Sequence, residues 1–177
     1  MAATLATALD RLVLMISAAM AIFAGLLLAA LYVIVQYEVF TRFVLHAPTH
    51  WTHEVSTFAI SWVGLLAAPY VLRLGSHLEV DLITTRLPRG ARNALGVATD
   101  LLGAGFCAFA AWGGAGFVEL AHMMEATSAS ELDTPLWIPY LVIPVAFGLL
   151  ALEFVARAVA RTGLVRGREA TSTAIHI

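Results

Sequence analysis

Residues 12–35 read LVLMISAAMAIFAGLLLAALYVIV, a run of apolar and small residues without a charge. As an α-helix rising about 1.5 Å per residue, the run reaches about 36 Å, which exceeds the roughly 30 Å hydrocarbon core of a bilayer. The run is too long for the apolar core of a signal peptide, no basic stretch precedes Arg11, and no small-residue cleavage site follows. We therefore expect it to remain in the mature protein as a membrane-spanning helix.

Three further segments have the same character. Residues 55–72 are uncharged, residues 95–118 are interrupted only by Asp100, and residues 136–152 follow Pro135, which is a helix-start signal. Pro139 and Pro144 should kink the last of these helices. The sequence thus predicts an all-α membrane protein, with four transmembrane helices in a single domain over residues 1–177.

The composition excludes an ordinary soluble domain. Of the 177 residues, 60% are hydrophobic and only 12% are charged, whereas soluble domains average about 25% charged residues. Four spans account for most of the chain and leave no room for a separate soluble domain.

The basic residues are unevenly distributed. All ten are arginines, and nine of them lie before the first span, between the second and third spans, or after the fourth. The first connection holds only Arg42, and the third, residues 119–135, holds none. Because cytoplasmic segments of membrane proteins are enriched in basic residues, we expect both termini and the second connection to be cytoplasmic. The C-terminal residues 162–177 should form a disordered tail.

The second connection has a helical pattern of its own. Within residues 76–87, Leu78, Leu82, Ile83 and Leu87 fall on one helical face, and Pro88 ends the segment. This spacing predicts a short amphipathic helix that lies on the membrane surface and contacts lipid. An ordered loop is the alternative.

Small residues follow one face of the third span and one face of the first span. Such faces allow close approach between helices in a bilayer. We therefore expect them to pack against other helices, either in this chain or in a partner. The residues are Gly96, Asp100, Gly103, Cys107, Ala111 and Gly114 in the third span, and Ala18, Ala21, Gly25 and Ala29 in the first.

Charged residues lie near the predicted membrane edges. Glu38 and Arg42 are four residues apart at the end of the first span, and Glu153 and Arg157 repeat this spacing at the end of the fourth. Pairs with this spacing stabilise helix ends. Glu54 begins the second span, where the helix dipole favours an anion, and its side chain is also within reach of Arg42.

The sequence contains no strong pattern of a catalytic, metal or cofactor site. His50, His53 and Glu54 could bind a metal, but their spacing is a weak signal. The six histidines lie in connections or the tail, so a pair of mid-span haem ligands is missing. The single Cys107 excludes a disulfide framework. There is no phosphate-binding loop, no nucleophile elbow and no basic surface for nucleic acid. Asp100 is the ionisable residue deepest within a span, and we favour a structural polar contact over a place in an ion pathway.

Several short motifs lie between residues 39 and 148. They are Arg42; Pro48 with Trp51, Thr52 and Glu54; Arg73, Gly75 and His77 followed by Asp81; and Ser130 with Pro135, Trp137, Tyr140, Ile143 and Pro144. Together these motifs resemble the small membrane subunit, DctQ-like, of tripartite ATP-independent periplasmic (TRAP) transporters. His53 departs from this family, which usually has a glutamate there.

The resemblance implies a subunit of a sodium-coupled secondary transporter in the bacterial inner membrane. Such a transporter has a periplasmic binding protein, a large membrane subunit that carries the substrate and sodium sites, and a small subunit that braces the large one. The implied role is that of a scaffold for organic-acid uptake, with neither enzymatic activity nor a cofactor. The candidate structural or partner-contact residues are Glu38, Arg42, Trp51, Glu54, Arg73, His77, Asp81, Asp100, Trp137, Tyr140 and Pro144.

Two other functions of small membrane proteins fit the sequence less well. A membrane anchor of a respiratory enzyme would be expected to hold haem between mid-span histidines, which the sequence lacks. A small self-contained multidrug exporter needs an acidic residue at the membrane centre, whereas Asp100 lies about two helical turns after Arg92, near the cytoplasmic edge.

Overall fold

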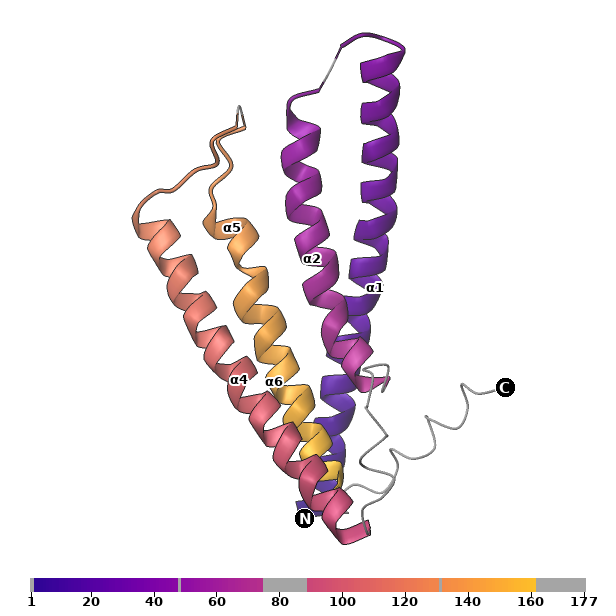
Figure 1. Ribbon diagram of the computed structural model, residues 1–177, viewed down its shortest axis with the longest axis vertical. Helices are drawn as coiled ribbons and strands as arrows, with labels where there is room; N and C mark the ends of the chain where they lie inside the picture. Colours follow the sequence, from indigo (N-terminus) through magenta and orange to yellow (C-terminus); the bar gives the residue numbers. More distant parts are fainter. Residues whose placement is uncertain (1, 48, 75–88, 131, 162–177) are drawn as a thin grey trace, which may run out of the picture.

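The computed structural model describes residues 2–47, 49–74, 89–130 and 132–161 (Figure 1). Four helices among these residues are long and apolar enough to cross a membrane, which confirms the expected all-α fold with four spans. The elements in chain order are α1 (Ala2–Phe43), α2 (Trp51–Arg73), α4 (Arg89–Met123), α5 (Trp137–Tyr140) and α6 (Val142–Arg161).

Several predictions fall outside the described residues. The interfacial helix at residues 76–87, the tail at residues 162–177, and the candidate residues His77 and Asp81 all belong to this group. The orientation of the chain across the membrane also stays a prediction.

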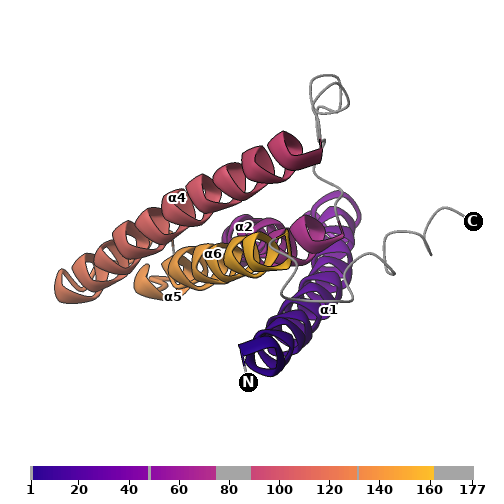
Figure 2. The same cartoon turned by 90° about the horizontal axis from the view of Figure 1, so that it is seen from below.

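The helices form two hairpins. Helix α1 packs mainly on α2, and α4 packs mainly on α6; α6 also contacts α2 and α1, so it joins the two hairpins. The hairpins converge at the end that carries the N-terminus and diverge towards the opposite end (Figure 1). Seen from below, α6 lies between α4 and the α1–α2 hairpin (Figure 2).

The fourth span is broken near its prolines. Helix α5 ends at Tyr140 and α6 begins at Val142, so the expected kink is present as a short interruption at Leu141. Proline cannot donate a backbone hydrogen bond, which leaves carbonyls in the preceding turn without a helical partner. The indole Nε1 of Trp62 in α2 donates to the Pro139 carbonyl at 3.2 Å. A side chain of a neighbouring helix therefore hydrogen-bonds the backbone beside the interruption.

The small face of α4 packs against α6. A Cβ placed on Gly103 would lie 2.9 Å from the Phe154 ring, and one on Gly114 would lie 2.6 Å from Ile143. Because nothing larger than a hydrogen fits at these two positions without a shift, the glycines permit the close approach of α4 and α6. The expectation for the third span is thus confirmed at these positions.

The small-residue face of α1, unlike that of α4, is not packed against another helix at its glycine. The buried positions of this helix include Val13, Ser17, Ala24 and Leu31. A Cβ on Gly25 would meet nothing within 4 Å. The predicted face is therefore not covered by this chain at Gly25, and its contact with a partner stays a prediction.

Candidate functional site

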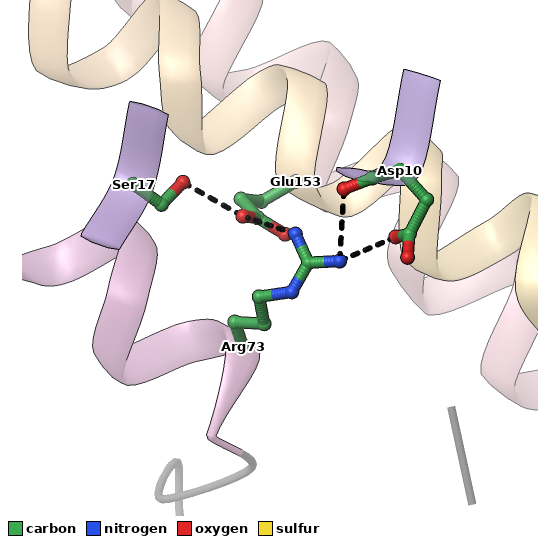
Figure 3. Close-up of polar contacts among 4 residues, drawn as sticks. All are labelled: Asp10, Ser17, Arg73 and Glu153. Carbon is green, nitrogen blue, oxygen red and sulfur yellow. Dashed lines mark hydrogen bonds and ion pairs between the residues drawn. The ribbon is translucent and has the colours of Figure 1, made fainter. Parts of the chain in front are cut away.

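A buried cluster of charged side chains lies where the hairpins converge. Arg73, in the last turn of α2, donates from Nη1 to Glu153 Oε1 of α6 at 3.1 Å and from Nη2 to Asp10 Oδ1 of α1 at 2.5 Å (Figure 3). The same Nη2 reaches the Asp10 carbonyl at 3.1 Å, and the Ser17 hydroxyl donates to Glu153 Oε1 at 2.7 Å. We call Asp10, Ser17, Arg73 and Glu153 the charged hub. The hub joins α1, α2 and α6.

The two oppositely charged side chains at the centre of the hub are almost completely buried. The side chain of Glu153 has 0% exposure and that of Arg73 has 9%. A buried charge is tolerated only when partners replace the water it has lost. The Arg73 guanidinium and the Ser17 hydroxyl take the place of water around the Glu153 carboxylate. Arg73 and Glu153 therefore serve as structural links between helices.

A second cluster joins α4 to α6. Asp100 has 1% side-chain exposure; its Oδ1 accepts from Arg157 Nε at 3.0 Å and its Oδ2 accepts from Arg161 Nε at 2.8 Å. The i,i+4 spacing had suggested Glu153 as the partner of Arg157. That pair stays a prediction. The structure shows that these two residues, on the same helix, bind charges on two different neighbouring helices.

Two acidic residues lie at the diverging end of the hairpins. Glu38 forms the expected pair with Arg42, at 2.8 Å, and also accepts from the Thr49 hydroxyl. Glu54 is buried in the first turn of α2 and accepts a hydrogen bond from the Ser130 hydroxyl, in the connection between α4 and α5. Glu54 therefore links the two hairpins.

Two aromatic candidates lie near the same end. The rings of Trp51 and Tyr37 have centroids 6.4 Å apart, and this contact stays within the α1–α2 hairpin. Trp137 meets His122 edge-on, at 5.6 Å between centroids. These contacts hold the ends of α2, α4 and α5 to their neighbours.

The other two candidates of the fourth span lie against α4. Tyr140 meets Phe117 edge-on at 5.4 Å between centroids. Pro144 Cδ lies 3.3 Å from the position that a Cβ on Gly114 would occupy. Both residues thus contribute to the packing of α4 against the fourth span.

The sequence interpretation missed Asp10, Ser17 and Ser130 as partners of the buried charges. Asp10 does carry a usable signal, because it is an acid at the same predicted membrane edge as Arg73. Ser17 carries none, since a serine within an apolar run is ordinary. Within residues 2–47, 49–74, 89–130 and 132–161, no three His, Cys, Asp or Glu side chains gather in a way that could hold a metal ion.

These features define a multi-pass helical membrane protein whose buried charges bind one another within the chain. The family model described as "Tripartite ATP-independent periplasmic transporters, DctQ component" matches residues 31–163, which is more than half of the chain. The chain belongs to this family of TRAP transporter components. The match confirms the resemblance seen in the short motifs.

Individual relatives carry TRAP transporter names. The chain is 32% identical over 136 residues to the isethionate TRAP transporter permease protein DctMQ of Oleidesulfovibrio alaskensis, covering 73% of this chain and 21% of that protein. It is 34% identical over 116 residues to the C4-dicarboxylate TRAP transporter small permease protein DctQ of Rhodobacter capsulatus, covering 64% and 50%. It is 24% identical over 75 residues to the sialic acid TRAP transporter small permease protein SiaQ of Vibrio cholerae, covering 42% and 43%. The matched regions thus span half or less of each of these relatives.

Proposed function

We propose that this protein is the small scaffold subunit of a sodium-coupled TRAP transporter that takes up organic acids from the periplasm. It works with a large permease subunit, which carries the substrate and sodium sites, and with a periplasmic binding protein that docks on the complex. The family match favours this function over a respiratory membrane anchor and over a self-contained exporter.

The observation that carries the scaffold role is the placement of the buried charges. Among the described residues, the buried charged side chains are Glu54, Asp100 and Glu153, and each binds side chains of this chain on another element. An apolar cluster of Ala24, Leu66 and Val142 lies between α1, α2 and α6. A transport path needs polar groups that exchange partners with the cargo, whereas these charges hold helices together.

The relatives support the partner and the class of substrate. In the isethionate permease protein DctMQ, the region similar to this chain makes up 21% of a longer chain. This supports association of the small subunit with a much larger membrane part. Isethionate, C4-dicarboxylates and sialic acid are all organic acids, which supports an organic acid as the cargo.

The arginines at the converging end of the hairpins support the proposed orientation in the bacterial inner membrane. Arg73, Arg157 and Arg161 lie at the helix ends that converge with the N-terminal end of α1 (Figure 1). Arginine-rich membrane edges are typically cytoplasmic. We therefore propose that the converging end faces the cytoplasm and the diverging end faces the periplasm.

Reconstitution tests the proposal. A large TRAP permease subunit and this subunit are placed in proteoliposomes, with a periplasmic binding protein and radiolabelled candidate acids outside and an inward sodium gradient. We expect uptake with both subunits and none with this chain alone. Sodium-driven uptake by this chain alone would overturn the scaffold role, and so would full activity of the large subunit without it.

A further inference from the structure

At the end opposite the charged hub, the two hairpins are linked through the connection between α4 and α5. This connection is braced by its own backbone: Ser128 N donates to the Thr134 carbonyl at 3.0 Å, and Leu136 N donates to the Ala126 carbonyl at 2.9 Å. An isolated bridge pairs Thr127 with Pro135. These backbone contacts hold the two sides of the connection together. The hydroxyl groups of Ser128 and Ser130 therefore belong to a connection that is fixed to the α4–α6 hairpin.

Glu54 of the other hairpin faces these hydroxyl groups. Its Oε2 accepts from the Ser130 hydroxyl, whereas its Oε1 is buried and has no hydrogen-bond partner among the described residues. The Ser128 and Ser130 oxygens are themselves 3.0 Å apart. Glu54 is only 7% exposed, so the Ser130 hydroxyl takes the place of water at Oε2 of the carboxylate.

We propose that Glu54 and Ser130, with Ser128 hydrogen-bonded to Ser130, form a clamp that sets the angle between the α1–α2 and α4–α6 hairpins. The hub fixes the converging end, so the diverging end is where a change of angle would move the helices furthest. Hydrogen bonds to a carboxylate are stronger than those between neutral groups, which suits a single acid to this task. Glu54 is thus a positioning residue, and its effect on transport rests on the proposed function.

A simpler role for Glu54 is also testable. An acid in the first turn of a helix stabilises that helix through the helix dipole. That role would lower the stability of α2 when Glu54 is replaced, but it would not change the distance between the hairpins. A distance measurement therefore separates the clamp from the dipole effect.

The experiment measures distances between spin labels by pulsed electron paramagnetic resonance. In a Cys107→Ala background, which removes the only native cysteine, labels are placed at the exposed residues Thr57 of α2 and Leu120 of α4. The protein is reconstituted in lipid nanodiscs. Glu54→Ala should broaden the distance distribution and shift its mean by at least one helical turn, about 5 Å. Glu54→Gln, which keeps an acceptor but loses the charge, should shift it less.

Matched controls make the result specific. A label pair at Val71 and Val155, which are 38% and 40% exposed and lie near the hub, should keep its distance in the Glu54 variants. Glu38→Gln alters an acid at the same end, whose side chain binds Arg42 and Thr49 of its own hairpin, and should leave the Thr57–Leu120 distance unchanged. Ser130→Ala should reproduce part of the shift, and Ser130→Thr should restore the wild-type distribution.

The spin-label distances test the Glu54 clamp independently of whether the chain supports transport. An unchanged Thr57–Leu120 distribution in Glu54→Ala would refute the clamp, and so would an equal change at Val71 and Val155. If the scaffold function holds, Glu54→Ala should also reduce uptake while co-purification with the large subunit is retained. Failure of wild-type uptake would count against the proposed function and leave the distance test intact.

Discussion

Replacing Arg73 by methionine tests whether the charged hub holds the bundle together. Methionine keeps the apolar stem but removes the guanidinium that lies 3.1 Å from Glu153 Oε1. At an effective dielectric constant of about 20, two unit charges at this separation attract by roughly 5 kcal/mol before desolvation is counted. Removing one partner of a buried ion pair costs about 3–5 kcal/mol, because the other charge stays buried without compensation. We expect Arg73→Met to lower the free energy of unfolding by an amount in this range.

The assay is unfolding in mixed micelles by titration with a denaturing detergent, followed by circular dichroism. A double variant, Arg73→Met with Glu153→Leu, should recover part of the loss, because the buried Glu153 charge is gone while Asp10, which is 20% exposed, still lacks its cation. Arg42→Met is the matched control, since Arg42 is 58% exposed and pairs with Glu38 on its own helix. Exposed pairs of this kind contribute about 0–1 kcal/mol.

Two results would refute the reasoning about the hub. One is a loss for Arg73→Met no larger than that for Arg42→Met. The other is a double variant whose loss equals the sum of the single losses, since contacting charges should couple.

Three further predictions follow from the fold. Reporter fusions at His122 and Arg166 should give opposite readouts in cells, and matching readouts would contradict the proposed topology. Gly114→Ala should cost about 1–3 kcal/mol relative to Gly113→Ala in the same detergent titration, because a Cβ at residue 114 meets Ile143 at 2.6 Å while one at residue 113 meets nothing within 4 Å; equal stabilities would contradict the tight α4–α6 contact. Asp100→Asn should leave sodium-driven uptake by the complete transporter partly intact, and complete loss with normal assembly would indicate a coupling role.

The fold could be predicted from the sequence because crossing a bilayer requires a long apolar run, and four such runs are present. The ends of the helices could not be predicted in the same way. Helix α1 extends from Ala2 to Phe43, well beyond the apolar residues 12–35. The apolar run reports which part of a helix crosses hydrocarbon, whereas alanine and other good helix formers carry the helix on past it.

Of the contacts in the candidate site, only those between residues close together in the sequence could be predicted. The Glu38–Arg42 pair follows from i,i+4 spacing, because one helical turn brings the two side chains together whatever the fold. The contact between Arg73 and Asp10 joins residues 63 positions apart. Helical spacing does not specify which helices become neighbours, so this contact needed the packed structure.

The length of α1 has a consequence for the surrounding lipid. Its 42 residues correspond to about 63 Å, which exceeds the roughly 40–45 Å of a bilayer with its headgroups. A helix of this length extends beyond the membrane or tilts away from the bilayer normal, and a thinner bilayer favours a larger tilt angle. Asp10 and Ser17 bind Arg73 of α2 and Glu153 of α6. A change in the tilt of α1 should therefore also change the positions of α2 and α6. The acyl-chain length of the lipids is therefore a variable that should tune the geometry of the whole bundle.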